Sequence, residues 1–376
     1  MQPKRVLLLA IVSVLLSLCG VTAQAQTYKV LYSLKCGPSD GQTPEAGLVR
    51  DPAGNLYGTT ANGGSPSNAG VVFKIAPDGI ETVLHSFTGS PDGRFPYAGL
   101  VLDGTGSFYG TTSEGGAYDL GTVFKVSADG KESVLHSFSG PPDGQSPYAE
   151  LVHDSLGNFY GTTYSGGANG FGSIFELGAS GIETVLYSFP GPPGDFYPMS
   201  ALVRDTNGNL YGTTATSVFK LDANGFYTTL HTFNELPDGQ GPEAGVMRDT
   251  AGNLLGTTQY GGVFGQGTVY KIDTASNETV LYSFSGKRDG GVPHAVLSED
   301  SKGNLYGTTE LGGSPQCSCG TIFRLSPEAK ETALYRFTGG ADGSQPVAGL
   351  IHSAGSFYGT TSGGSACGTV FQFTLP

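Results

Sequence analysis

Apolar and polar residues alternate in short runs along the chain, and turn residues separate the runs. Between Ala98 and Phe138, the runs Ala98–Leu102, Ser107–Thr112, Gly121–Val126 and Glu132–Phe138 are rich in Val, Leu, Phe, Tyr and Thr. Asp-Gly or Gly-Gly pairs lie between them. Short runs with a period of two predict strands, and short glycine-containing links predict an antiparallel four-stranded meander.

This unit of about fifty residues occurs seven times. Its marker is Gly-Thr-Thr after an aromatic residue or leucine, and the glycines are 52, 51, 51, 44, 51 and 52 residues apart: Gly58, Gly110, Gly161, Gly212, Gly256, Gly307 and Gly359. A fixed period of this size, with four strands per unit, is typical of propeller blades. The sequence therefore predicts an all-β, seven-bladed propeller of four-stranded antiparallel blades over residues 26–376.

The phase of the repeat predicts how the ring closes. Tyr28–Leu34 matches the fourth strand of a unit, and Thr369–Thr374 matches the third. We expect the N-terminal strand to complete the last blade. Cys36 follows the first of these runs and Cys367 precedes the other, so antiparallel pairing predicts a Cys36–Cys367 disulfide.

Two further cysteines, Cys317 and Cys319, lie in a loop of the sixth unit. The sequence leaves open whether they form a bridge. Two thiols are too few soft ligands for a structural zinc site, so we expect no metal there.

The N-terminus has the features of an export signal. Lys4 and Arg5 precede the apolar run Val6–Leu18, and Ala23-Gln24-Ala25 follows. This order predicts a signal peptide over residues 1–25 that is cleaved after Ala25. The apolar run is too short to favour a membrane anchor. We therefore expect a secreted or periplasmic protein with no membrane span after cleavage.

Charge and motifs narrow the function. The net charge is −13, and it becomes −15 when Lys4 and Arg5 leave with the signal peptide. An acidic chain without a basic cluster argues against nucleic acid as a partner. The sequence contains no Gly-x-Ser-x-Gly elbow, Walker loop, dinucleotide fingerprint or His-Glu-x-x-His motif. We expect no cofactor, and a binding protein rather than an enzyme.

Most repeated polar residues favour structural roles. An aspartate opens the turn between the first two strands, where it accepts turn amides, and the tyrosine before Gly-Thr-Thr is expected to pack between blades. In the fourth strand, His85, His136 and His231 occupy the position that tyrosine has in other units: Tyr32, Tyr187, Tyr282 and Tyr335. This exchange favours a structural role for the histidines.

A ligand site is expected where the units differ. The residue after the linker proline enters the first strand near the axial mouth, and it reads Glu45, Tyr97, Tyr148, Met199, Glu243, His294 and Val347. Glu150 nearby replaces a small residue. We predict a ligand site at the axial mouth formed by Glu45, Tyr97, Tyr148, Glu150, Glu243 and His294. Neutral variation at a tolerant position is the alternative.

Two other asymmetries are visible. The loop in Thr213–Phe219 is about seven residues shorter than its counterparts, which predicts either a notch that admits a ligand or neutral loop drift. At the other end of the first strands, cationic residues gather with Glu299: Arg50, His153, Arg204, Arg248 and His352. These residues either attract an anion or are neutralised locally.

The expected function is a monomeric, non-catalytic scaffold that binds a small molecule, a glycan or a protein. The alternative is an extracytoplasmic lyase or hydrolase that uses the axial-mouth residues for acid–base chemistry.

The repeated motif resembles a known family. Gly-Leu-Val-x-Asp-x-x-Gly-Asn-Leu-Tyr-Gly-Thr-Thr, followed by Gly-Thr-Val-Phe-Lys and Glu-Thr-Val-Leu-His-Ser-Phe, is similar to the GloVer (Gloeo-Verruco) tandem repeat over Tyr28 to Phe373. These exported proteins are called choice-of-anchor because their carboxyl-terminal sorting tails vary. The resemblance implies export and a repeat fold, and it supplies no catalytic residues. A looser similarity to the propeller of the streptogramin lyases extends to the blade plan alone.

Overall fold

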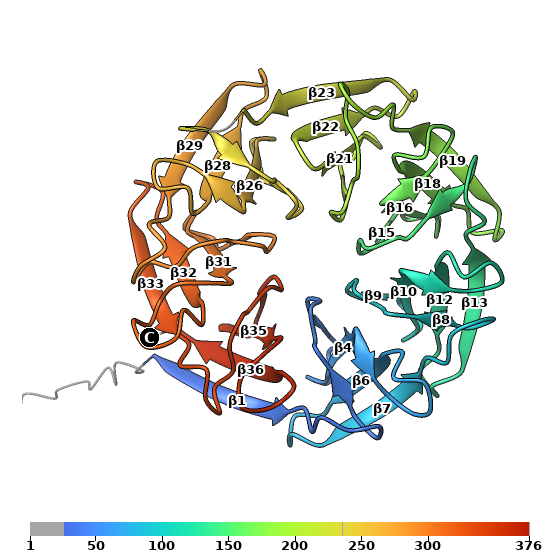
Figure 1. The fold of residues 1–376 in the computed structure, drawn as a ribbon, viewed down its shortest axis with the longest axis horizontal. Coiled ribbons are helices and arrows are strands. Elements are labelled where there is room, and N and C mark those ends of the chain that lie inside the picture. Colours follow the sequence, from blue (N-terminus) through green and yellow to red (C-terminus); the bar gives the residue numbers. More distant parts are fainter. Residues whose placement is uncertain (1–25, 235, 376) are drawn as a thin grey trace, which may run out of the picture.

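The chain forms a ring of seven four-stranded antiparallel sheets around a central axis (Figure 1). The computed structural model describes residues 26–234 and 236–375. The predicted signal peptide, residues 1–25, lies outside the described residues. Within the described ranges there is no helix, and hence none that is long and apolar enough to cross a membrane. The predicted all-β seven-bladed propeller is confirmed.

Each blade runs from an inner strand near the axis to a long outer strand on the circumference. The first four blades consist of β3 (Val49–Arg50), β4 (Leu56–Thr60), β6 (Val71–Ile75) and β7 (Glu81–Ser86); β9 (Val101–Leu102), β10 (Phe108–Thr112), β12 (Thr122–Val126) and β13 (Glu132–Ser137); β15 (Val152–His153), β16 (Phe159–Thr163), β18 (Ser173–Leu177) and β19 (Glu183–Ser188); and β20 (Val203–Arg204), β21 (Leu210–Thr213), β22 (Ser217–Leu221) and β23 (Tyr227–Thr232).

The remaining blades follow the same order. They consist of β25 (Met247–Arg248), β26 (Leu254–Thr258), β28 (Thr268–Ile272) and β29 (Glu278–Ser283); β30 (Ser298–Glu299), β31 (Leu305–Thr309), β32 (Thr321–Leu325) and β33 (Glu331–Arg336); and β34 (Ile351–Ser353), β35 (Ser356–Thr361), β36 (Thr369–Thr374) and β1 (Thr27–Ser33).

Small two-stranded sheets tie the linker before a blade to the loop between its second and third strands. They pair β2 (Gly41–Gln42) with β5 (Asn62–Gly63), β8 (Gly93–Arg94) with β11 (Glu114–Gly115), β14 (Gly144–Gln145) with β17 (Ser165–Gly166), and β24 (Gly239–Gln240) with β27 (Tyr260–Gly261). Blades 6 and 7 have a single bridge in this place. These contacts place the linkers, and the loops between the second and third strands, on one face of the ring.

The N-terminal strand closes the ring as predicted. β1 pairs antiparallel with β36 in a register that runs from Thr27 opposite Thr374 to Ser33 opposite Thr369. In Figure 1 the first strand lies beside the last blade. Cys36 and Cys367 form a disulfide with a Cα–Cα distance of 5.1 Å, so the predicted bridge is confirmed.

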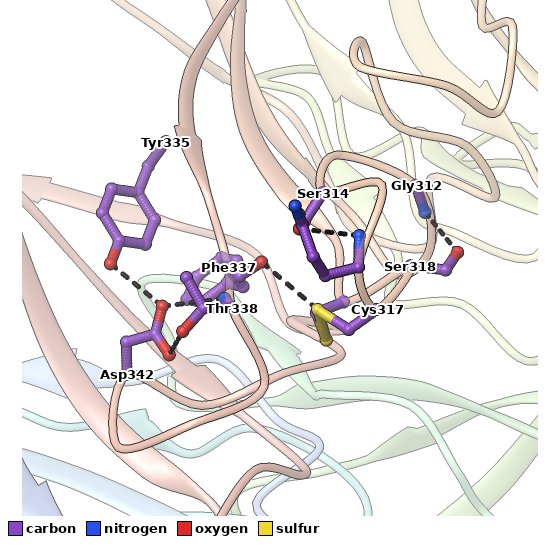
Figure 2. Close-up of a disulfide and its surroundings, with 10 residues drawn as sticks. Gly312, Ser314, Cys317, Ser318, Tyr335, Phe337, Thr338 and Asp342 are labelled. Atoms are coloured by element: carbon purple, nitrogen blue, oxygen red, sulfur yellow. Dashed lines mark hydrogen bonds between the residues drawn. A yellow bond between two sulfur atoms is a disulfide. The ribbon is translucent and has the colours of Figure 1, made fainter.

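Cys317 and Cys319, which the sequence left open, also form a disulfide. It lies in the loop between β31 and β32, where Cys317 contacts the carbonyl oxygen of Phe337 (Figure 2). Tyr335 and Asp342 form a hydrogen bond in the same part of blade 6.

The Gly-Thr-Thr motif joins each blade to the next. In blade 2, a β-carbon at Gly110 would lie 2.7 Å from the ring of Phe124, so glycine leaves the space that this buried ring fills. Thr111 donates a hydrogen bond of 3.1 Å to the carbonyl oxygen of Ala149 in blade 3. Thr112 bonds within its own blade. The first threonine makes the same bond to the next blade at all seven contacts.

The inner strand is shorter than predicted. The sequence suggested Ala98–Leu102, whereas β9 pairs with β10 only at Val101 and Leu102. The reason is that the carbonyl oxygen of Ala98 accepts a hydrogen bond from Thr59 of the preceding blade. The first residues of the inner strand therefore belong to the blade contact.

The hydrophobic core is divided among the blade contacts. Each of seven buried clusters contains residues from two neighbouring blades. Tyr57 of blade 1 packs on Phe108 of blade 2 with ring centroids 4.3 Å apart, and its hydroxyl group donates to Asp51. The repeated tyrosines and aspartates thus form the frame, as the sequence indicates.

Candidate functional site

The axial channel contains a cavity of about 1030 Å³ that is lined by linker residues and by the inner strands. All six predicted ligand-binding residues line this cavity: Glu45, Tyr97, Tyr148, Glu150, Glu243 and His294. Met199 and Val347, which take the equivalent place in blades 4 and 7, line it too. The structure therefore brings the predicted residues together around one space.

Strand alternation explains why these side chains reach the cavity. Leu100 is buried in the contact between blades 1 and 2, while Tyr97 and Gly99 line the cavity. The same alternation in every blade gives two rings of lining residues. The mouth ring is Glu45, Tyr97, Tyr148, Met199, Glu243, His294 and Val347, and the inner ring is Gly47, Gly99, Glu150, Ala201, Gly245, Val296 and Gly349.

One side of the mouth is aromatic. The ring centroids of Tyr97 and Tyr148 are 5.4 Å apart, those of Tyr148 and Tyr164 are 5.7 Å apart, and Tyr164 stacks on Tyr197 at 4.5 Å. Blades 2, 3 and 4 thus contribute a continuous row of tyrosine rings beside the cavity.

The other side of the mouth is acidic. Glu45, Glu243 and Glu310 line it, and Gln259 donates a hydrogen bond of 2.9 Å to Glu243. Burial raises the pKa of Glu45, and the neighbouring charge of Glu310 raises it further. The residues that line the cavity include four carboxylates and His294 but no lysine or arginine. The cavity therefore lacks a fixed positive charge to balance its carboxylates.

Glu150 is the one ionisable residue of the inner ring. Burial raises its pKa from the ordinary value of 4.5 to about 7, and no neighbouring charge or hydrogen bond contributes to this shift. Its carboxylate lies against Gly99 of the preceding blade, which has no side chain to fill that space. A group that ionises near neutral pH can hold a cation or exchange a proton with a bound molecule.

Sequence reasoning missed several residues around the mouth. Tyr197 and Gln345 precede the linker prolines, while Tyr164, Gln259 and Glu310 follow Gly-Thr-Thr. Both positions vary between units, as the mouth ring does. The same comparison of equivalent positions, extended to these two places, would have found them.

The short loop of blade 4 opens a second hollow beside the first. Thr214 and Ser217 close the turn between β21 and β22. The hollow has a volume of about 540 Å³, and its lining includes Ala215, Thr216, Tyr260 and Glu243. Because Glu243 lines both spaces, this arrangement favours the notch over neutral loop drift.

Aromatic side chains of the blades contact the cationic residues at the far end of the inner strands. Arg50, Arg204 and Arg248 each lie 5.3–5.9 Å from the centre of a tyrosine ring in the preceding blade. His352 stacks on Phe357 at 4.7 Å. These contacts favour local neutralisation over an anion site at that mouth.

The sequence matches the profile of one known family. A family profile described as the Gloeobacter/Verrucomicrobia repeat matches residues 18–217 and 214–376. No match was found among curated proteins.

Solved structures share the fold. The extracellular domain of a protein assigned as a one-component system from B. thetaiotaomicron matches with a TM-score of 0.61 and 8% identity over 92% of this chain and 40% of that one. The extracellular domain of a protein assigned as a hybrid two-component system from the same organism matches with a TM-score of 0.59 and 13% identity over 93% and 41%. This chain thus spans about two fifths of those chains. A gluconolactonase from Xanthomonas campestris matches with a TM-score of 0.48 and 12% identity over 93% and 90%.

Proposed function

The chain belongs to the Gloeobacter/Verrucomicrobia repeat family, and from this premise we propose that it is an extracytoplasmic binding propeller whose axial cavity takes a small organic cation. The observation that carries the proposal is the lining of the cavity. Four carboxylates and a row of tyrosine rings surround a space that, among residues 26–234 and 236–375, no lysine or arginine lines.

Electrostatics favours a cation over other ligands. Carboxylates without a countercharge in a partly dehydrated space are unfavourable, and a positively charged group relieves their repulsion. Tyrosine rings attract ammonium and guanidinium groups through their negative faces and also provide apolar contact area. The carboxylates of Glu45, Glu150, Glu243 and Glu310 would repel an anion.

The carboxylates of Glu150 and Glu243 lie at different depths, Glu150 in the inner ring and Glu243 in the mouth ring. Glu150 of the inner ring lies below the mouth ring, so an ammonium group bound to it places the rest of the ligand beside Tyr97 and Tyr148. The hollow at blade 4 continues from Glu243 and offers room for a longer ligand. We therefore propose an elongated amine that contacts Glu150 at one end.

Export is part of the proposal. The predicted signal peptide over residues 1–25 supports it, and so do two disulfides, because disulfides persist in oxidising compartments. The similar extracellular domains from B. thetaiotaomicron share the fold, and their location agrees with the proposal.

A lyase or hydrolase is the second candidate, and one observation favours it. The pKa of Glu150 near 7 suits a general acid or base at neutral pH. The two candidates differ in turnover: a binding module returns its ligand unchanged, whereas an enzyme converts it.

A thermal-shift screen tests the proposal. Cationic, neutral and anionic molecules of matched size are compared at pH 8, and every hit is then incubated with the protein and analysed for products. We expect stabilisation by cationic members and no conversion. Stabilisation by neutral or anionic members alone contradicts the proposed ligand class. Conversion that Glu243→Gln or His294→Ala abolishes favours the enzyme.

A further inference from the structure

A second group of ionisable residues lies on the circumference, far from the channel in the blade plan. There the end of one outer strand meets the start of the next, and an aspartate of the linker lies between them. Three of these contacts, called the His seams below, bring together His85, Asp92 and Glu132; His136, Asp143 and Glu183; and His231, Asp238 and Glu278. In each group the three ligand atoms lie within 4.8 Å of one another.

The histidine and the aspartate of each His seam form a hydrogen bond, and the same separation suits two ligands of one metal ion. The Nε2 atom of the histidine lies 3.1, 3.2 and 3.1 Å from the Oδ2 atom of the aspartate in the three seams. Two ligand atoms that each lie ~2.1 Å from an ion, at an angle of roughly 90–110°, are separated by about 3.0–3.4 Å. The histidine side chains are 19–22% exposed, so water can fill a further coordination position.

The glutamate of each His seam has an oxygen without a partner. Oε1 of Glu132, Glu183 and Glu278 is buried and forms no hydrogen bond. Each His seam therefore brings a histidine and two carboxylates together, and one buried glutamate oxygen there has no hydrogen-bond partner.

The other four seams serve as internal comparisons. In two of them a tyrosine replaces the histidine and the glutamate remains, as Glu81 and Glu331. Lys35 lowers the pKa of Glu81 and Arg336 lowers that of Glu331, against the larger effect of burial. Each of these seams thus has a lysine or arginine whose charge acts on its glutamate.

In the last two seams a second tyrosine replaces the glutamate. Tyr187 stacks on Tyr227 at 4.2 Å, and Tyr28 stacks on Tyr335 at 4.1 Å. These seams have only one carboxylate, which the tyrosine hydroxyl groups satisfy, as Figure 2 shows for Tyr335 and Asp342. Histidine thus occurs where two carboxylates meet and no lysine or arginine acts on the glutamate.

We propose that the three His seams are binding sites for a divalent transition-metal ion of the Zn²⁺ class. The ion would bind the histidine Nε2 atom and one oxygen of each carboxylate, which is a ligand set that suits zinc. Since the ligands come from neighbouring blades, each ion clamps one blade to the next. This proposal goes beyond the structural role and the absence of metal that the sequence suggested.

The test uses zinc chloride as the probe and the whole mature chain. Protein freed of metal with a chelator is titrated by calorimetry at pH 7.5, and bound zinc is counted by atomic emission. We expect three zinc ions per chain and a rise in the unfolding temperature. The triple variant His85→Tyr, His136→Tyr, His231→Tyr carries at each seam the residue that four other seams have, so it should fold. It should lose all three ions, and each single variant should lose one.

Two controls keep the result decisive. His352→Gln removes a histidine outside the seams and should leave all three ions bound. Glu132→Gln removes one ligand at constant volume and should weaken one site at least tenfold. A folded wild-type chain that binds no zinc overturns the proposal. Zinc binding that the triple variant retains also overturns it.

Discussion

Glu150 of blade 3 and Gly99 of blade 2 occupy complementary places in the inner ring of the channel. A β-carbon at position 99 would collide with Oε2 of Glu150. The missing side chain at Gly99 thus leaves the space in which the only carboxylate of the inner ring lies. The position of the Glu150 carboxylate, and of a positively charged group bound to it, should therefore depend on Gly99.

Gly99→Ala should therefore move the Glu150 carboxylate without unfolding the protein, because the end of a flexible side chain can rotate away. We expect the affinity for a cationic ligand to fall about tenfold, which is roughly 1.4 kcal/mol. The matched control is Gly47→Ala in the same ring, where a β-carbon would meet nothing closer than 3.9 Å. Equal affinities of the two variants, measured by calorimetry, would speak against the role of Glu150.

The raised pKa of Glu150 predicts how stability depends on pH. Between pH 4.5 and about 7 the folded chain holds a proton on Glu150 that the unfolded chain has lost, so this residue makes the folded state less stable as pH rises. We expect Glu150→Gln to equal the wild type near pH 4 and to exceed it by up to about 3 kcal/mol at pH 8. Urea unfolding at both pH values measures the difference. A constant difference across this range would contradict the assignment.

The threonine bonds between blades predict a stability effect away from the cavity. Thr111→Val keeps the shape of the side chain but leaves the carbonyl oxygen of Ala149 without its partner in a buried place. We expect a loss of about 1–3 kcal/mol in the free energy of unfolding. Thr111→Ser keeps the hydroxyl group and should restore part of this loss. Identical stability of Thr111→Val and wild type would rule out an energetic role for this bond.

The two disulfides should contribute unequally. Cys36 and Cys367 are 331 residues apart, whereas Cys317 and Cys319 are two apart. Loop entropy gives the long loop a stabilising effect of roughly 6 kcal/mol before any strain is subtracted. Replacing Cys36 and Cys367 by serine should lower stability by several kcal/mol, while the same change at Cys317 and Cys319 should have a small effect. Calorimetric unfolding measures the stability of both variants. A larger loss on removing the Cys317–Cys319 bridge would contradict the stabilising role of the Cys36–Cys367 bridge.

Much of the fold follows from the sequence because the repeat fixes it. The spacing of Gly-Thr-Thr and the phase of Tyr28–Leu34 determine the number of blades and the closing strand. The short inner strand could not be predicted, because the bond from Thr59 to Ala98 links different blades and leaves no local pattern.

The candidate site was predictable in part. Equivalent positions in different units revealed the mouth ring and Glu150, since these residues depart from the repeat. Tyr164 and Tyr197 were missed because loops carry them, and their stacking depends on the packing of blades 3 and 4.

The central claim is that the axial cavity selects a cation through Glu150. The most direct measurement is calorimetric titration at pH 8 with benzylamine, benzyl alcohol and benzoate, which share a ring and differ in charge. The account predicts that wild type binds benzylamine at least tenfold more tightly than benzyl alcohol, binds no benzoate, and loses the preference for the amine in Glu150→Gln. Binding of benzoate or benzyl alcohol as tight as that of benzylamine, or a preference that Glu150→Gln retains, would contradict it.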